Sequence, residues 1–274
     1  MSSPILVGAV VYDPKVVVIW EIIKDFFESE GCPIDTVFYS NYELQVGALL
    51  SGHIHIAWNS PLAWIDAQRR SGSTCRAIAM RDTDRDRVTH WIVRRQSGFR
   101  DLKELRGKIV ATGAKDSPQA TLIPLLRLAA EGLTPYQDVQ VRRFDRMVGK
   151  HGDHVGGELE ALQCLQRGEC EACAALDLNW ESWQSDGTAN PESLMSLATT
   201  HPFDHCNFTV RMDFPAERES NWLDVLFRMR YENPDHRKMM DMEGLKAWLP
   251  GRTTGYRELT EAVQQFRFFD DHDK

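Results

Sequence analysis

Two strand-to-helix corners in the sequence carry residue types that suit the binding of a small polar or anionic group. Ser117 and Pro118 follow the apolar run 109–111, and Ser60 and Pro61 follow a second apolar run. Serine is a favoured N-cap and proline suits the first helical position, so each pair predicts the start of a helix. The free amides and the positive dipole end of such a helix favour an anion or a polarised carbonyl group.

The repetition of this arrangement matters, because each corner taken alone is equally typical of a capped surface helix. In open α/β sheets, ligands bind beyond the carboxyl ends of the strands. Two corners of the same build, one in each of two predicted lobes, therefore predict a ligand cleft to which both contribute. The sequence contains no nucleophile elbow, Walker loop, dinucleotide glycine fingerprint or zinc-protease helix motif.

Histidines near predicted strand ends and loops form a second group, which could bind a metal or transfer protons. They are His53, His55, His151, His154, His201 and His205. His53 and His55 would share one face of a strand, and His151 and His154 flank a Gly-Asp pair. No third ligand stands at a fixed short spacing from either pair, so no cofactor or dedicated metal site is predicted. A histidine-bound metal stays the less favoured alternative.

The six cysteines are irregularly spaced and do not form the framework of a disulfide-rich protein. They are Cys32, Cys75, Cys164, Cys170, Cys173 and Cys206. Cys170 and Cys173 lie in the run 169–176, for which we predict a strand, and an offset of three would place their thiols on opposite faces. We therefore interpret the cysteines as buried, reduced and structural, rather than as a zinc or redox pair.

Composition and charge exclude several classes of protein. The chain has 274 residues, of which 42% are hydrophobic, and this is enough for a globular protein with one large domain or two lobes. A formal charge of −8 argues against nucleic acid as a partner. No apolar stretch is long enough to insert into a membrane. Met1 runs into a predicted strand without a basic leader, so the sequence as it stands predicts a cytoplasmic protein, or a periplasmic one if Met1 replaces a removed signal peptide.

Strands and helices are expected to alternate along most of the chain, which predicts an α/β fold with parallel, doubly wound sheets. The expected strands are 5–12, 34–40, 54–58, 75–80, 88–94, 108–112, 139–144 and 170–176, and the expected helices are 16–30, 42–50, 62–70, 121–131, 158–166, 222–230, 236–242 and 256–269. The alternation restarts after a charged turn at 81–87. This predicts one lobe of residues 1–92 plus 195–274, with a helical C-terminal tail, and a second lobe of residues 93–194.

The order of these features resembles the substrate-binding proteins of phosphate- and phosphonate-type ABC transporters, over roughly residues 4–235. The shared marks are Tyr42 at the start of a helix before Gly52, Ser60-Pro61 with Trp64, the segment Asp101-Leu-Lys-Glu-Leu-Arg-Gly-Lys108, Ser117 seven residues before Pro124, and Gly168-Glu-Cys-Glu-Ala172. The resemblance implies a two-lobed type II periplasmic binding protein fold with a ligand cleft between the lobes. It also implies a transporter permease as partner if the chain is secreted.

By this resemblance the protein binds a small polar or anionic molecule, and Tyr42, Trp64, Ser117 and Asp177 would be cleft residues. Together with the corners and nearby polar side chains, the expected ligand contacts are Tyr12, Tyr42, His55, Asn59, Ser60, Trp64, Ser117, Gln119, Glu158, Asp177 and His205.

Three positions depart from the family pattern. Gln119 replaces a hydroxyl, His55 replaces an aspartate, and Glu158 stands where the family has a ligand-contacting histidine. A carboxylate at that position would repel a phosphonate dianion. The alternative is therefore a cytoplasmic enzyme on the same scaffold, such as an aromatic-acid decarboxylase-like enzyme or a metal-assisted lyase, with His55, His154 and Glu158 as acid-base residues.

Overall fold

The structure, a computed structural model, describes residues 3–152 and 157–270 and divides the chain into two compact units. Unit 1 comprises Met1–Arg85 and Asp204–Gly255, and unit 2 comprises Asp86–Phe203 and Tyr256–Lys274. The boundaries differ from the predicted division after residues 92 and 194. The chain crosses a third time after Gly255, so the end of the predicted helical tail belongs to unit 2 and not to unit 1.

Unit 1 is built on a six-stranded mixed sheet with the order β11-β4-β10-β3-β1-β2. Its strands are β1 (Ile5–Val10), β2 (Ile34–Tyr39), β3 (Ile56–Asn59), β4 (Cys75–Arg81), β10 (Asn207–Arg211) and β11 (Trp248–Pro250). Strand β1 pairs in parallel with β2 and β3, whereas β10 is antiparallel to both β3 and β4. The sheet is therefore not purely parallel, because a strand from the last third of the chain enters it between β3 and β4.

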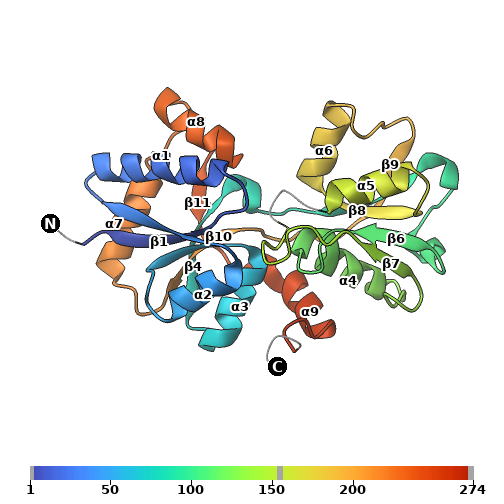
Figure 1. Ribbon diagram of the computed structural model, residues 1–274, viewed down its shortest axis with the longest axis horizontal. Helices are drawn as coiled ribbons and strands as arrows, with labels where there is room; N and C mark the ends of the chain where they lie inside the picture. The colour runs from blue at the N-terminus through green and yellow to red at the C-terminus, as the bar shows by residue number, and fades with distance from the viewer. Residues whose placement is uncertain (1–2, 153–156, 271–274) are drawn as a thin grey trace. The chain divides into compact units, whose positions relative to one another are not determined.

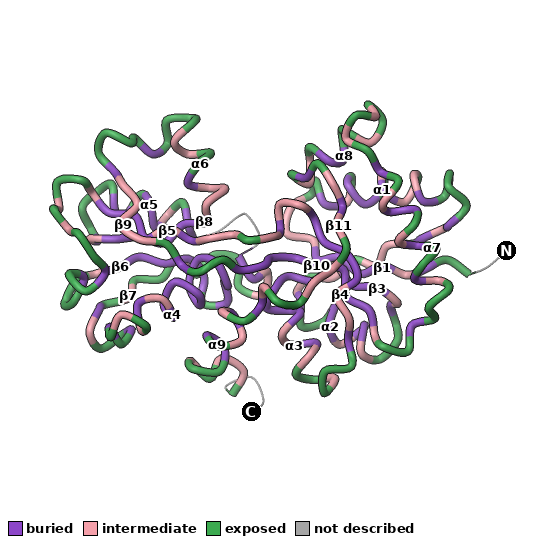
Figure 2. The backbone as a smooth tube through the Cα atoms, turned by 180° about the vertical axis from the view of Figure 1, so that it is seen from behind, coloured by how far each residue is buried: buried purple, intermediate pink, exposed green. Residues whose placement is uncertain are grey.

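Helices cover both faces of this sheet (Figure 1). They are α1 (Lys15–Ser29), α7 (Ala216–Leu226) and α8 (Pro234–Glu243) on one face, and α2 (Tyr42–Leu50) and α3 (Pro61–Ser71) on the other. Ile19 of α1, Trp222 of α7 and Met240 of α8 lie in one core with the sheet. Leu49 of α2 and Ala57 of β3 belong to the core on the other face. Figure 2 shows the burial concentrated along the strands.

Unit 2 has its own five-stranded mixed sheet with the order β7-β6-β8-β5-β9. Its strands are β5 (Thr89–Arg94), β6 (Ile109–Thr112), β7 (Gln140–Arg143), β8 (Ala172–Leu176) and β9 (Leu194–Thr199). Strand β6 is parallel to β7 and β8, and β5 is antiparallel to β8 and β9. The helices are α4 (Ile123–Ala130) and α9 (Arg257–Gln265) on one face, with α5 (Glu158–Gln166) and α6 (Asp177–Ser185) on the other.

The C-terminal helix α9 joins unit 2 because its apolar side packs on α4. Leu259, Ala262 and Val263 of α9 are buried, although the helix as a whole is polar. Phe266, just after α9, packs against the core that α4 and the sheet share. Sequence alone placed this helix with unit 1 because adjacency along the chain, rather than its packing partner, was the only guide.

Elements with strong local signals were predicted best. Helices α2 and α5 have the predicted bounds, whereas α6, β9, β10 and β11 were not predicted. The unpredicted strands pair antiparallel with neighbours distant in sequence, and a pairing of that kind leaves little local signal.

All six cysteines are described and buried, and none of them forms a disulfide. Cys164, Cys170 and Cys173 lie in the same hydrophobic core, so the predicted opposite faces for Cys170 and Cys173 are wrong. Strand β8 begins only at Ala172, and the alternation of faces along a strand therefore does not extend back to Cys170. Burial raises the pKa of the Cys173 thiol well above its ordinary value, which favours the inert thiol form.

Among the residues that the structure describes, no helix combines the length and the apolar character needed to cross a bilayer.

Candidate functional site

The Ser117 corner has the predicted geometry. Strand β6 ends at Thr112, Ser117 has an extended backbone, and its Oγ accepts a hydrogen bond from the Ala120 amide at 3.1 Å. Pro118 opens a π-helical turn, Pro118–Leu122, which continues directly into α4. The predicted N-cap is confirmed. A π-turn was not predicted, and such turns occur frequently at functional sites.

The Ser60 corner repeats this build in unit 1. Ser60 follows β3, its Oγ accepts from the Ala63 amide at 3.1 Å, and Pro61 is the first residue of α3. Ser60 and Ser117 are both completely buried. Capping uses a lone pair of the Ser117 oxygen, so the hydroxyl hydrogen of that residue can donate a second bond.

Several predicted ligand contacts gather at the same edge of the unit 1 sheet as Ser60. Tyr12 follows β1 and Tyr42 follows β2, and the carboxyl ends of these parallel strands lie at one edge with the end of β3. Trp64 lies one turn into α3. Tyr42 and Trp64 are buried and Tyr12 is half-buried. The structure therefore brings these aromatic residues to the predicted edge.

Asn59 is at this edge too, but its side chain is committed to the fold. Its Nδ2 donates to Thr209 Oγ1 at 3.0 Å, and its Oδ1 accepts from Gln45 Nε2 at 2.9 Å. Thr209 Oγ1 donates in turn to Asn207 at 2.7 Å. This buried network joins β3, α2 and β10, which gives Asn59 a structural role instead of the predicted ligand contact.

His55 lies at the opposite edge of the sheet from Ser60, which corrects both roles predicted for it. It precedes β3, and its Nδ1 accepts a hydrogen bond from the Leu6 amide at 2.8 Å. Burial, together with Arg218 and Arg211, lowers the pKa of His55 below its ordinary value. The prediction placed His55 at the same end of β3 as Ser60. In the structure the two residues lie at opposite ends of this strand.

In unit 2, Gln119 and its neighbour Asp116 are buried beside Ser117. Gln119 is 2% exposed and its Nε2 donates to the Gly152 carbonyl at 2.8 Å. Asp116 is 3% exposed and its Oδ2 accepts from the Gly149 amide at 2.6 Å. Sequence reasoning missed Asp116, although its place directly before the N-cap serine was a usable signal.

Glu158 and Asp177 meet near the carboxyl end of β8, which is parallel to β6 and so ends at the same edge of the sheet as the Ser117 corner. Glu158 Oε2 accepts from the Leu176 amide at 2.8 Å and from Asn179 Nδ2 at 2.9 Å. Asp177 is the first residue of α6; its Oδ1 accepts from the Leu178 amide at 2.8 Å, and its Oδ2 is 3.6 Å from an Arg87 guanidinium nitrogen. Both carboxylates thus bind donors of their own unit. His154 lies outside the described residues.

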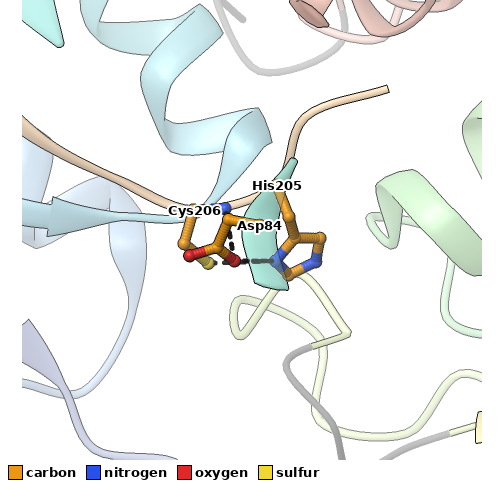
Figure 3. A group of neighbouring side chains, drawn as sticks. All are labelled: Asp84, His205 and Cys206. Carbon is orange, nitrogen blue, oxygen red and sulfur yellow. Dashed lines mark hydrogen bonds and ion pairs between the residues drawn. The ribbon is translucent and has the colours of Figure 1, made fainter. Parts of the chain in front are cut away.

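His205 lies two residues before β10, in a buried group with Asp84 and Cys206 (Figure 3). Its Nδ1 is 3.1 Å from Cys206 Sγ and 3.5 Å from Asp84 Oδ1. One donor atom from each of the three residues falls within 4.8 Å of the others, a spacing that could hold a metal ion.

Arg81 already binds the Asp84 carboxylate with Nε and Nη2. Burial raises the pKa of the Asp84 carboxyl, but Arg81 and His205 outweigh burial and hold that pKa well below its ordinary value. The Arg81 guanidinium therefore balances the negative charge of the Asp84 carboxylate. Asp84 and Arg81 were not predicted as important, although they lie three residues apart in the charged turn.

Two surface pockets lie away from both corners. One of about 690 Å³ is lined by Ile5 and Arg218 among others, near the amino end of β1. The other, of about 590 Å³, is lined by Arg94 and Glu192 among others, near the amino end of β8. Neither is lined by a corner serine, since each lies at the opposite edge of its sheet.

Comparison with known proteins identifies a family over most of the chain. The family described as ABC transporter, phosphonate, periplasmic substrate-binding protein matches residues 11–256. A 29-residue segment is 55% identical to an uncharacterised protein of Haemophilus influenzae, and this match spans 11% of the chain and 41% of that protein.

Similar solved structures agree in fold. XAC2383 from Xanthomonas citri bound to ATP has a TM-score of 0.73 and 18% identity over 100% of both chains. PhnD1 from Prochlorococcus marinus in complex with methylphosphonate has a TM-score of 0.70 and 15% identity, over 96% of this chain and 98% of its own. A binding protein component of an ABC phosphonate transporter from Pseudomonas aeruginosa has a TM-score of 0.64 and 14% identity, over 98% and 88%. At these identities the likeness establishes the fold alone, and the predicted fold class is confirmed.

Proposed function

Because the chain belongs to the family of periplasmic substrate-binding proteins of phosphonate-type ABC transporters, we propose that it binds a small polar or anionic molecule at its two serine corners. The family match at 11–256 includes both Ser60 and Ser117. The observation that carries the proposal is the shared build of the corners: a buried N-cap serine, then a proline, beyond the carboxyl end of a strand. Such a corner directs the positive end of a helix dipole toward an acceptor group.

A phosphonate is the first ligand to test, since a relative with the same fold was solved with methylphosphonate. The predicted selection against phosphonates rested on Glu158 and His55. His55 lies at the other edge of its sheet, and the Glu158 carboxylate accepts two hydrogen bonds from unit 2. His55 therefore does not support that selection, whereas Glu158 lies at the same end of its sheet as the Ser117 corner and its effect on a phosphonate stays a prediction.

Calorimetric titration of the whole chain with methylphosphonate tests the proposal. Ser117→Ala removes the hydroxyl and should weaken binding by about 1 kcal/mol or more, the usual cost of leaving a buried partner unpaired. Asn233→Ala is the matched control, because Asn233 caps α8 by accepting from the Asp235 amide and belongs to neither corner. Equal affinity of wild-type protein and the Ser117 variant for methylphosphonate would contradict the assignment of this serine.

Two of the three residues that motivated the enzyme alternative, His55 and Glu158, lie in the part of the chain that the structure describes. His55 and Glu158 are engaged by backbone amides of Leu6 and Leu176, and each of these bonds lies within one unit. These contacts favour structural roles for both residues, and the enzyme alternative stays a prediction. A permease partner and the cytoplasmic or periplasmic location stay predictions.

A further inference from the structure

A short segment after β7, residues 145–152, lies directly on the Ser117 corner and is called the strap here. Arg146 Nε of the strap donates to Glu160 Oε1 of α5 at 3.0 Å, and three further hydrogen bonds join the strap to residues beside Ser117. Asp145 Oδ1 accepts from the Lys115 amide at 2.7 Å, Gly149 N donates to Asp116 Oδ2 at 2.6 Å, and Gly152 O accepts from Gln119 Nε2 at 2.8 Å. Two of these bonds use side chains that flank Ser117 in sequence.

The strap approaches so closely that only glycine fits at its end. A Cβ atom on Gly152 would collide with the Oγ and Cβ of Ser117, and the Gly152 φ of +72° is in the left-handed region. Gly157, just beyond the strap, would similarly collide with Gly113 and the Ala114 amide. Gly152 and Gly157 therefore allow the backbone to lie close to the corner, where the Ser117 side chain is fully buried.

The strap is held in a conformation that its residues do not prefer. Met147 and His151 have φ values of +50° and +53°, which side chains other than glycine rarely adopt. Strain of this kind persists only where surrounding contacts offset it, and it is common in segments that move. The bonds to Asp116 and Gln119 are contacts of that kind.

Asp116 and Gln119 each bind the strap through one side-chain polar atom. The other polar atom of each side chain has no partner among the described residues. Asp116 Oδ1 and Gln119 Oε1 are buried, and neither atom accepts a hydrogen bond from a described residue. Both are acceptors, so the group that completes them must be a donor. Buried orphans in a native protein call for an explanation such as a missing water or ligand.

We propose that the strap closes over Ser117 in the ligand-free protein, and that Asp116 and Gln119 are the positioning residues that latch it. Ligand entry displaces the strap from the Ser117 hydroxyl. The two latch side chains are then released from Gly149 and Gly152, and they accept hydrogen bonds from the ligand or its waters. This inference rests on the proposed function only in treating Ser117 as a ligand contact; the strap and its latch can be tested without any ligand.

The test uses Ser117→Cys as a reporter in the full chain, with the labelling rate of a thiol reagent as the measurement. All native cysteines are buried and give a slow background. The reporter should label slowly, and adding Gln119→Leu or Asp116→Ala should accelerate its labelling at least tenfold. Thr121→Val is the matched control: Thr121 is equally buried in the same π-turn, and its hydroxyl has no partner among the described residues. That change should leave the rate unaltered.

Labelling of native Cys173, in the core of the same unit, separates strap opening from unfolding. The proposal requires Cys173 to stay slow while the reporter accelerates. It is overturned if the reporter labels at the rate of the denatured chain without any latch change, if neither latch variant alters the rate, or if Cys173 accelerates in parallel. A failure of methylphosphonate to bind would count against the proposed function and leave these outcomes intact.

Discussion

Arg81 and Asp84 form a bidentate ion pair inside unit 1, with Nε 2.7 Å from Oδ2 and Nη2 2.8 Å from Oδ1. Both side chains are almost completely buried, and Arg81 Nη1 also donates to Glu243 at 2.9 Å. Asp84 in turn binds the backbone amides of His205 and Cys206 through its carbonyl and carboxylate oxygens. The pair therefore joins the chain just before its first crossing to the chain just after its second.

Replacing this arginine should strongly destabilise unit 1. Arg81→Met leaves the buried carboxylates of Asp84 and Glu243 without their shared cation, and removing one partner of a buried pair typically costs about 3–5 kcal/mol. The measurement is the free energy of unfolding from urea denaturation. Arg228→Met is the control, since Arg228 pairs with Glu30 at an exposed site of the same unit and should cost less than about 1 kcal/mol. Similar losses of unfolding free energy in the two variants would show that the buried pair stabilises the protein no more than an exposed pair does.

The same group predicts an acid-sensitive stability. The folded pKa of Asp84 lies well below its ordinary 3.8, so its stabilising contribution is complete above that value and is lost as pH falls below it. Asp84→Asn should be less stable than wild type at pH 6, and the difference should shrink steadily below pH 3.8. Denaturation curves across this range check the expectation. A difference that does not change with pH would contradict the low pKa.

Glu243 should show the opposite sign and so serves as an internal comparison. Burial raises its pKa above the ordinary 4.5, more than Arg81 lowers it. A raised folded pKa gives a contribution that is present below the unfolded pKa and is lost as pH rises through the folded one. The free energy of unfolding of Glu243→Gln, relative to that of wild type, should therefore rise as pH increases from 4.5. The same trend in the Asp84 and Glu243 variants would refute the assignment of the two signs.

His55 should matter for stability and not for ligand binding. His55→Ala leaves the half-buried Leu6 amide without its acceptor, which should cost about 1 kcal/mol in the free energy of unfolding. Because the folded pKa of His55 is lowered, the wild-type advantage should be full above pH 6.5 and should diminish as pH falls below it.

Calorimetry with methylphosphonate provides the second measurement on this variant. The His55→Ala protein should match the wild-type affinity, since the imidazole is at the other edge of the sheet from Ser60. A loss of affinity in a variant that remains folded would return His55 to the ligand site predicted from the sequence. Ser117→Ala, measured alongside, shows the size of effect expected for a direct contact.

Sequence reasoning located the two corners but not the groups that surround them. Ser60 and Ser117 cap helices through amides only three residues away, so both the residue types and their spacing appear within one short window. The strap depends on Gly152 meeting Gln119, which are 33 residues apart, and no pattern within either segment indicates that contact. The bond of Asp116 to Gly149 also spans 33 residues, although the place of Asp116 directly before Ser117 was a local signal.

The sequence by itself determined what hydrogen bonds and periodicity within a few residues control. These features are the N-caps at Ser60 and Ser117, the bounds of α2 and α5, and the α/β class. Only the tertiary structure decided which edge of a sheet each side chain reached. It inserted β10 between β3 and β4, placed His55 away from Ser60, and set Cys206 against Asp84 across 122 residues of sequence. Burial of apolar faces selects these distant pairings, and it acts on the folded surface as a whole, so its choice is not written in any local spacing.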